Sequence, residues 1–232
     1  MLKKYCTHGA AALLSILIWL NAASLAVAQS AAEISNLVQG RYQNVQTIHA
    51  YFDQIITHKE SGVEEKRLGE IFFQKPMLVR WHTAPPLEEL ILLTGDVVWQ
   101  YFADEELAYK FDADAIDGQN GFLKVIIGQT RLDKNFKIEV LGDEGGLLKV
   151  LLEPYEPSQS MVEATMWINR ATGEIARLRI MDFYANLSEI TLNRQELDKP
   201  IPSSTFVFTP PPGTEIEDHT ENRRNFSEPL KN

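Results

Sequence analysis

The histidines are the residues of this sequence that come nearest to metal or acid–base chemistry. Four of them lie beyond the first 28 residues, at His49, His58, His82 and His219. Histidine ligands of a metal usually recur at short spacings on one element, and no two of these do. The sequence therefore predicts surface or strand histidines and no metal site.

An acidic run, DADAIDG over 112–118, has the composition of a calcium-binding loop. In the EF-hand pattern a glycine occupies position six and a bidentate glutamate occupies position twelve. Here Gly118 falls one place late, and Leu123 stands at position twelve. The run is therefore predicted to be an acidic turn that precedes a helix.

Motifs for nucleophilic or phosphate chemistry are missing from the sequence. It has no G-x-S-x-G, no glycine-rich phosphate loop and no recognisable Ser/His/Asp order. The carboxylates are numerous, but nothing marks two of them as a glycosidase pair. We expect a protein that is not an enzyme and has no cofactor. The alternative is a hydrolase with a Ser, His or acid cluster at a cavity mouth.

The N-terminus has the three parts of a secretory signal peptide. Lys3 and Lys4 precede an apolar run over 10–20, and small residues follow it. A retained membrane anchor is the alternative, but the run is short for a bilayer and Asn21 interrupts it. We expect a signal peptide over 1–28 that is cleaved at its end.

Cysteine and charge indicate the compartment and the class of partner. The only cysteine, Cys6, leaves with the signal peptide, and an exported chain without disulfides favours a bacterial periplasm. Cleavage also removes two lysines, which takes the formal net charge from −10 to −12. Such acidity argues against nucleic acid as a partner and against lasting attachment to an anionic membrane.

Residues 29–232 are predicted to form a single domain of short strands. Helical spacing of apolar residues appears over 31–42 and, between two glycines, over 121–128. The chain becomes proline-rich and then polar near its end, which predicts a loosely held tail over 210–232. The expected strands are 45–56, 67–73, 78–83, 89–93, 97–102, 107–111, 136–141, 147–153, 162–169, 174–183, 187–195 and 204–208.

So many short strands in one domain predict an antiparallel sheet that curls into a barrel or splits into a sandwich. Val79 and Trp81 share one face of their strand, and Trp99 and Tyr101 share one face of theirs. Inward aromatic side chains are the usual sign of a solid core. The pattern leaves a lined cavity open as the alternative.

The order of these segments resembles the LolA family, the periplasmic carriers of outer-membrane lipoproteins. The likeness covers nearly all of the mature chain. It is carried by Gly69, Phe72, Lys75-Pro76, Trp81 and the run Gly95, Trp99, Tyr101, which follow in the family's order. The segments VQTIHAYFDQ (45–54), GFLKVIIG (121–128) and STFVFTPPPGTEI (204–216) also match.

The resemblance implies a mainly β fold: an antiparallel, incomplete (half-open) β-barrel with an N-terminal helix and a short-helix lid over an apolar cavity. Lys75 stands where carriers of the enterobacterial type have an arginine that hydrogen-bonds the lid, so Lys75 is expected to latch it; a solvated turn lysine is the alternative. The expected cavity residues are Phe72, Val79, Trp81, Trp99, Tyr101, Ile138 and Met166, with Phe122 and Ile126 on the lid.

The implied function is that of a monomeric periplasmic chaperone. It would take the acyl chains of lipoproteins from an inner-membrane release complex and deliver them to an outer-membrane acceptor. An acyl anchor needs little chemistry, because shielding each methylene is worth roughly 0.8 kcal/mol and requires only an apolar pocket. The alternative is a lipid-binding or sensor module of the same fold with another lipid or a regulatory partner.

Overall fold

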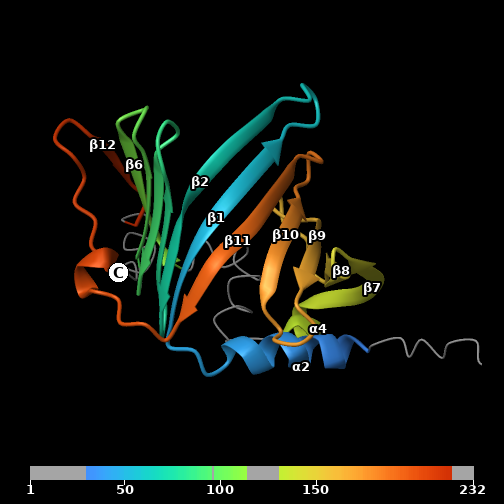
Figure 1. Ribbon diagram of the computed structural model, residues 1–232. Helices are drawn as coiled ribbons and strands as arrows, with labels where there is room; N and C mark the ends of the chain where they lie inside the picture. The colour runs from blue at the N-terminus through green and yellow to red at the C-terminus, as the bar shows by residue number, and fades with distance from the viewer. Residues whose placement is uncertain (1–29, 96, 114–130, 221–232) are drawn as a thin grey trace, which may run out of the picture.

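The computed structural model describes residues 30–95, 97–113 and 131–220 (Figure 1). Its first element is helix α2, Ala31–Tyr42, which confirms the helix predicted there. Ser30 and Glu33 form a capping box, in which each side chain accepts a hydrogen bond from the other residue's backbone N–H. The buried residues Ile34, Val38 and Tyr42 recur every four positions, so the helix packs one stripe against the sheet.

The described chain contains twelve strands. They are β1 (Thr47–Thr57), β2 (Glu64–Gln74), β3 (Leu78–Thr83), β4 (Glu89–Thr94), β5 (Val97–Phe102), β6 (Leu107–Asp112), β7 (Phe136–Glu144), β8 (Leu147–Pro154), β9 (Glu163–Ile168), β10 (Ile175–Met181), β11 (Leu187–Leu197) and β12 (Glu215–Asp218). Two short helices join them, α4 (Leu132–Asn135) and the 3-10 helix η3 (Ser203–Phe206). The sequence does not predict α4, because four residues are too few to show a helical period.

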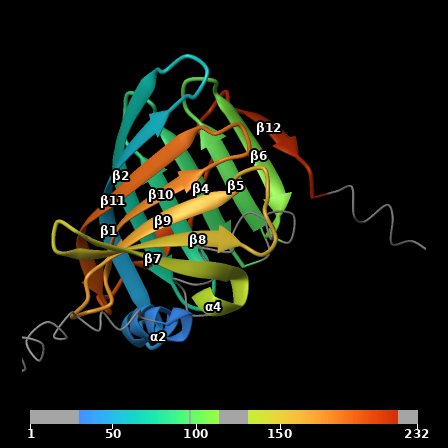
Figure 2. The same ribbon diagram turned by 90° about the vertical axis from the view of Figure 1, so that its right-hand side faces the viewer.

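All twelve strands belong to one sheet, in the order β12-β6-β5-β4-β3-β2-β1-β11-β10-β9-β8-β7. Every neighbouring pair is antiparallel except β12 and β6, which are parallel. The edges of the described sheet, β12 and β7, do not pair with each other, so the sheet is not closed into a barrel. Figures 1 and 2 show a strongly curved sheet with α2 across one end.

The predicted fold class is confirmed, because the structure is an antiparallel, half-open barrel with an N-terminal helix. The predicted lid helix, 121–128, lies outside the described residues, as does the predicted signal peptide.

The concave side of the sheet holds the main hydrophobic core, to which both flanks of the sheet and α2 contribute. Tyr42 ties the helix to the sheet: its hydroxyl donates to Gln195 Oε1 at 2.9 Å and accepts from the Ile175 N–H at 3.1 Å. Burial raises the pKa of Tyr42 to about 12. The strand residues of this core include Ile48, Phe73, Val79, Leu93 and Val98 on one flank and Val150, Met166, Ile168 and Leu178 on the other.

The convex side carries a second, smaller core beneath residues 200–220, here called the C-terminal strap. Phe206 of η3 is buried against Leu90 and Leu92 of β4. The ring of Phe208 lies 5.6 Å from that of Trp99 and 5.3 Å from that of Tyr101, between centroids. The strap therefore covers apolar residues on a face that an open sheet would otherwise expose to water.

Two predictions for the strap are wrong. Residues 203–206 form η3 rather than the predicted strand, because Phe206 turns inward onto the convex core. Part of the tail expected to be loose is ordered, since β12 extends the β6 edge and Lys110 Nζ lies 2.6 Å from Asp218 Oδ2. Residues 221–232 lie outside the described residues.

Candidate functional site

The concave face of the sheet is the candidate site, and four of the predicted wall residues lie on it. Val79 of β3 is 5 % exposed and belongs to the main core. Trp81, two residues along the same strand, has its ring centroid 4.7 Å from that of Phe52 in β1. Met166 is fully buried in this core and Ile138 packs against it, so both flanks of the sheet contribute to one apolar wall.

Phe72, Trp99 and Tyr101 lie on the opposite, convex face, so the prediction that they share a wall with Val79 and Trp81 is wrong. All three pack against the convex core, and Trp99 and Tyr101 face the strap. The ring of Phe72 stacks on that of His49 with centroids 4.2 Å apart. These three residues support the fold from outside.

The strand register explains this error. Strands β4 and β5 pair so that Leu93 faces Val98 and Leu92 faces Trp99. Residues that face each other in an antiparallel ladder point to the same side of the sheet. Val98 therefore joins Leu93 in the concave core, and Trp99 joins Leu92 in the convex core. The alternation within a strand is readable from sequence, but both faces are apolar here, so it does not reveal which face is concave.

Gly69 explains how Phe52 lies against the wall. The two residues face each other across β1 and β2. A Cβ at Gly69 would lie 2.6 Å from the Phe52 ring and 2.1 Å from the carbonyl oxygen of His82. Real Cβ atoms do not approach other atoms so closely, so a residue without a side chain is required for this packing.

Lys75 contacts the end of helix α2. Its Nζ donates to the carbonyl oxygen of Gln43 at 2.6 Å. Gln43 is the C-cap of α2, where free carbonyls and the helix dipole favour a cation. The predicted lid contact, like the lid residues Phe122 and Ile126, falls outside the described residues. The partner seen for Lys75 is one that the sequence does not predict.

Charged residues appear on the concave face toward the end farthest from α2, beside apolar residues such as Ile56, which faces Glu65. On β2, Glu65 and Arg67 share the concave face with Gly69, Ile71 and Phe73, and the charged pair lies farthest from the helix. The sequence pattern did not reveal this, because charged residues that alternate along a strand normally indicate a solvated face.

Arg67 joins two of these carboxylates. Its Nη1 donates to Glu89 Oε2 at 2.5 Å, and its Nε donates to Glu65. Gln100 Nε2 donates to the other oxygen of Glu89 at 3.2 Å. Desolvation lowers the pKa of Arg67, but the hydrogen bond to Glu65 and the charge of Glu89 outweigh it and hold that pKa above its ordinary value.

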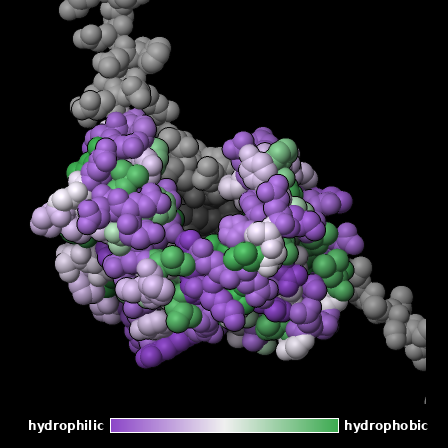
Figure 3. Space-filling view, turned by 90° about the horizontal axis from the view of Figure 1, so that it is seen from above, coloured by the Kyte–Doolittle hydropathy of each residue, from purple (hydrophilic) through white to green (hydrophobic). Residues whose placement is uncertain are grey.

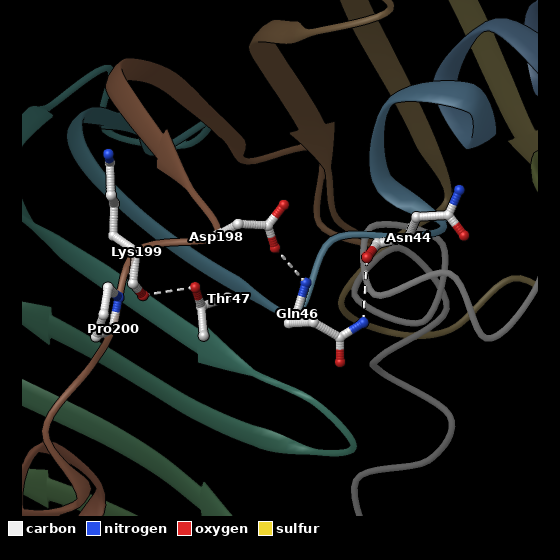
Figure 4. A pocket seen from close by; sticks show the side chains of 6 residues that line it. All are labelled: Asn44, Gln46, Thr47, Asp198, Lys199 and Pro200. Carbon is white, nitrogen blue, oxygen red and sulfur yellow. Dashed lines mark hydrogen bonds between the residues drawn. The ribbon is translucent and has the colours of Figure 1, made fainter.

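A small pocket of about 370 Å³ lies where α2 joins β1 and where β11 ends (Figure 4). Gln46 N–H donates to Asp198 Oδ1 at 2.7 Å, and the Thr47 hydroxyl donates to the Lys199 carbonyl at 2.7 Å. These bonds tie the connection after α2 to the end of β11. The pocket is lined by Asn44, Gln46, Thr47, Asp198, Lys199 and Pro200, so it is not part of the apolar wall.

Metal ligands do not gather anywhere in the described part of the chain, where no group of three or more His, Cys, Asp or Glu side chains could hold an ion. Three of the histidines lie beside carboxylates or aromatic rings: His49 Nε2 is 2.8 Å from Glu70 Oε2, His82 Nε2 is 3.3 Å from Glu88 Oε1, and His219 stacks on Phe111. Over 30–95, 97–113 and 131–220, no helix is long and apolar enough to span a membrane.

Comparison with known proteins gives one consistent family. A model of the outer membrane lipoprotein carrier protein LolA matches residues 43–209. The outer-membrane lipoprotein carrier protein of Methylibium petroleiphilum is 26% identical over 200 residues, which cover 86% of this chain and 96% of that protein. The carrier protein of the same name from Pseudoalteromonas translucida is 28% identical over 199 residues, or 85% of this chain and 93% of the relative.

A solved structure shows the same fold. An uncharacterised conserved protein from Thermus thermophilus superposes with a TM-score of 0.54 at 13% identity, over 82% of this chain and 100% of that chain.

Proposed function

Because this chain belongs to the LolA family, we propose that it is a lipoprotein carrier that holds acyl chains on its concave face. The single observation that supports this most is the apolar wall that Val79, Trp81, Ile138 and Met166 form across both flanks of an open sheet. If the sheet were closed into a barrel, these residues would only fill its core. Because the sheet is open, a bound acyl chain can reach them between its two flanks.

The physical task of such a carrier is to keep methylenes out of water. Each buried methylene is worth roughly 0.8 kcal/mol, so a pair of long acyl chains gains far more from an apolar wall than from any single polar contact. Met166 adds an unbranched, polarisable side chain that adapts to chains of different shape. No bond is made or broken in this task, and we propose no catalysis and no cofactor.

The route in this proposal begins with export. The N-terminal segment directs the chain to the periplasm, where the protein receives its cargo from an inner-membrane release complex. It then crosses as a monomer to an outer-membrane acceptor. The net charge of −12 after loss of two lysines supports a diffusing carrier, because it disfavours attachment to anionic membranes on either side.

The test is release of lipoproteins from spheroplasts of a Gram-negative bacterium. Purified protein lacking residues 1–28 is added, and newly made outer-membrane lipoproteins in the medium are measured by immunoprecipitation and mass spectrometry. We expect acylated lipoproteins in a one-to-one complex with the protein. Recovery of free lipids without lipoprotein, or no release at all, would contradict the proposal.

A further inference from the structure

The loop between β10 and β11 carries two adjacent aromatic side chains that face water. Phe183 is 68% exposed and Tyr184 is 66% exposed, more than any other large apolar or aromatic side chain that the structure describes. Their rings meet edge to face, with centroids 5.6 Å apart. Single exposed apolar residues are common on protein surfaces, but an adjacent pair at the tip of a loop is typical of a contact site.

This loop, residues 182–186, is held in one shape by hydrogen bonds. Asp182 accepts hydrogen bonds from the Asn186 backbone N–H and from its side-chain amide, both at 2.8 Å. The Phe183 N–H donates to the Gln159 carbonyl at 3.0 Å, which ties the loop to the β8–β9 loop. The Lys59 N–H donates to Asn186 Oδ1 at 3.0 Å, which ties it to the β1–β2 loop. The aromatic pair is therefore presented in a fixed position, so little loop entropy is lost on contact.

The pair stands on the rim of the sheet at the end opposite α2. Strand β1 begins close to α2 and ends at Thr57, which faces Leu187 at the start of β11. Figure 3 looks onto this end and shows hydrophobic residues among hydrophilic ones around a hollow. The apolar concave face reaches the same rim, because Ile180 packs against the main core three residues before Phe183, and Ile190 of the neighbouring strand is buried.

The composition of this rim favours a lipid surface as its partner. Phenylalanine and tyrosine together combine an apolar body with a polar tip, which suits the boundary between lipid headgroups and acyl chains. The two loops that meet here, 58–63 and 182–186, contain one lysine and two carboxylates, Glu60 and Asp182. They hold no basic cluster that would attract an anionic lipid, and the whole chain is acidic. The surface that fits is therefore one without net charge.

We infer that Phe183 and Tyr184 form a contact site for a neutral bilayer surface made of zwitterionic phospholipids. The two rings enter the headgroup region, and the acidity of the chain keeps the contact brief. This inference goes beyond the proposed function, which names a cargo but no lipid surface that the protein touches. The contact places the end of the apolar wall at the surface from which acyl chains emerge.

The experiment measures partition of the protein lacking residues 1–28 onto sucrose-loaded vesicles, by sedimentation. One set of vesicles contains phosphatidylcholine and phosphatidylethanolamine, and a second set also contains phosphatidylglycerol. The test variant is Phe183→Ser with Tyr184→Ser. The matched control is Val207→Ser with Ile216→Ser, which removes two exposed apolar side chains, 62% and 50% exposed, from the C-terminal strap. Circular dichroism checks that each variant is folded.

We expect the parent to bind the neutral vesicles and the test variant to bind them about tenfold more weakly, because two rings no longer leave water. The strap control should bind within about twofold of the parent. Phe183→Trp should bind more tightly than the parent, since tryptophan favours the membrane interface. Added phosphatidylglycerol should weaken binding of the parent at low salt, because both partners are then negatively charged.

The inference is overturned if the parent does not bind neutral vesicles, if the strap control loses as much binding as the test variant, or if phosphatidylglycerol strengthens binding. It is also overturned if the test variant binds vesicles as the parent does but releases less lipoprotein from spheroplasts, which would indicate a protein pocket as the partner. The proposed function is judged separately, by release of lipoproteins with the parent protein, so either can fail without the other.

Discussion

Gly69 belongs to the family pattern seen in the sequence, and the structure shows why a glycine is needed there. Its sequence position pointed to a family, and the structure gives the reason: the Phe52 ring and the His82 carbonyl occupy the space that a side chain would need. Val79, Trp81, Ile138 and Met166 lie on the concave face, and their role in lining an acyl cavity stays a prediction. The sequence could not place Trp99, because side-chain alternation is the same on a concave and a convex face.

Gly69→Ala should lower the free energy of unfolding by about 2–4 kcal/mol, because the new methyl group forces the Phe52 ring or the β3 backbone to move. Urea denaturation measures this. Gly40→Ala is the control, since Gly40 lies within α2 with open space around its Cα, and alanine there should stabilise the protein by about 0.5–1 kcal/mol. Equal stability of the two variants would show that the close approach at Gly69 is not needed.

Tyr42 gives the protein a specific alkaline pH dependence. Its pKa is raised from 10.0 to about 12 because burial disfavours the phenolate. Below pH 10 the hydroxyl is protonated in both states and adds no pH dependence. Between about pH 10 and 12 the unfolded chain loses this proton and the folded protein keeps it, so stability falls as the pH rises, by at most about 1.4 kcal/mol per unit.

The check is to compare urea unfolding at pH 9 and pH 11 for the parent, Tyr42→Phe and Tyr184→Phe. Tyr184 is 66% exposed and serves as the control. We expect Tyr42→Phe to lose less stability than the parent over this interval, and Tyr184→Phe to behave as the parent does. An unchanged slope in Tyr42→Phe would show that another group controls the alkaline limb.

At the scale of elements, Lys75 and helix α2 form a unit that the sequence did not reveal. The residue was identified as a latch from the family pattern, and the structure shows its ammonium on the Gln43 carbonyl at the end of α2. Helix α2 itself was predictable because its apolar stripe has the helical period. The contact between Lys75 and the end of α2 was not predictable, because two residues 32 positions apart leave no local signal in the sequence.

Lys75→Met should loosen the C-terminal turn of α2 while keeping the apolar stem of the side chain. We expect faster amide hydrogen exchange over the last turn of α2 and a loss of at most about 1 kcal/mol in stability, since the contact is exposed. Lys66→Met, on an exposed lysine of β2, is the control. Exchange of the α2 amides at the parental rate in Lys75→Met would mean that the contact does not hold the helix.

The C-terminal strap is the element whose prediction failed most clearly. The alternating run Thr205-Phe206-Val207-Phe208 reads as a strand, yet Phe206 belongs to a 3-10 turn that faces the convex core. A short apolar run fits either form, and the choice depends on β4 residues more than a hundred positions earlier in the chain. Because the strap covers the convex face, apolar residues such as Trp99 and Tyr101 can lie there as well as on the concave face.

At the scale of the whole molecule, the sequence predicted the strands and turns well and left the shape of the sheet undecided. Alternating strands are compatible with a solid sandwich and with a lined cavity, because both bury one face. The half-open barrel was expected from the resemblance to a family, and the structure confirms an open, curved sheet. Curvature and closure depend on pairings between distant strands, such as β1 with β11, that periodicity does not encode.

The central claim is that acyl chains bind to the concave face, and the tryptophans test it directly. Three of the four tryptophans lie beyond residue 28. Trp81 is on the concave face against Phe52, whereas Trp99 is beneath the strap and Trp167 is on the convex face beside Arg177, whose guanidinium carbon lies 3.9 Å from the ring centroid. Three variants that each keep one of these tryptophans, with phenylalanine at the other two positions, report the two faces separately.

The measurement is quenching of each tryptophan by a diacylglyceryl lipopeptide whose acyl chains carry bromine, which quenches indole only at short range. The concave-face account predicts strong, saturable quenching of Trp81 and little quenching of Trp99 or Trp167 at the same concentration. Quenching of Trp99 or Trp167 as strong as that of Trp81 would contradict it.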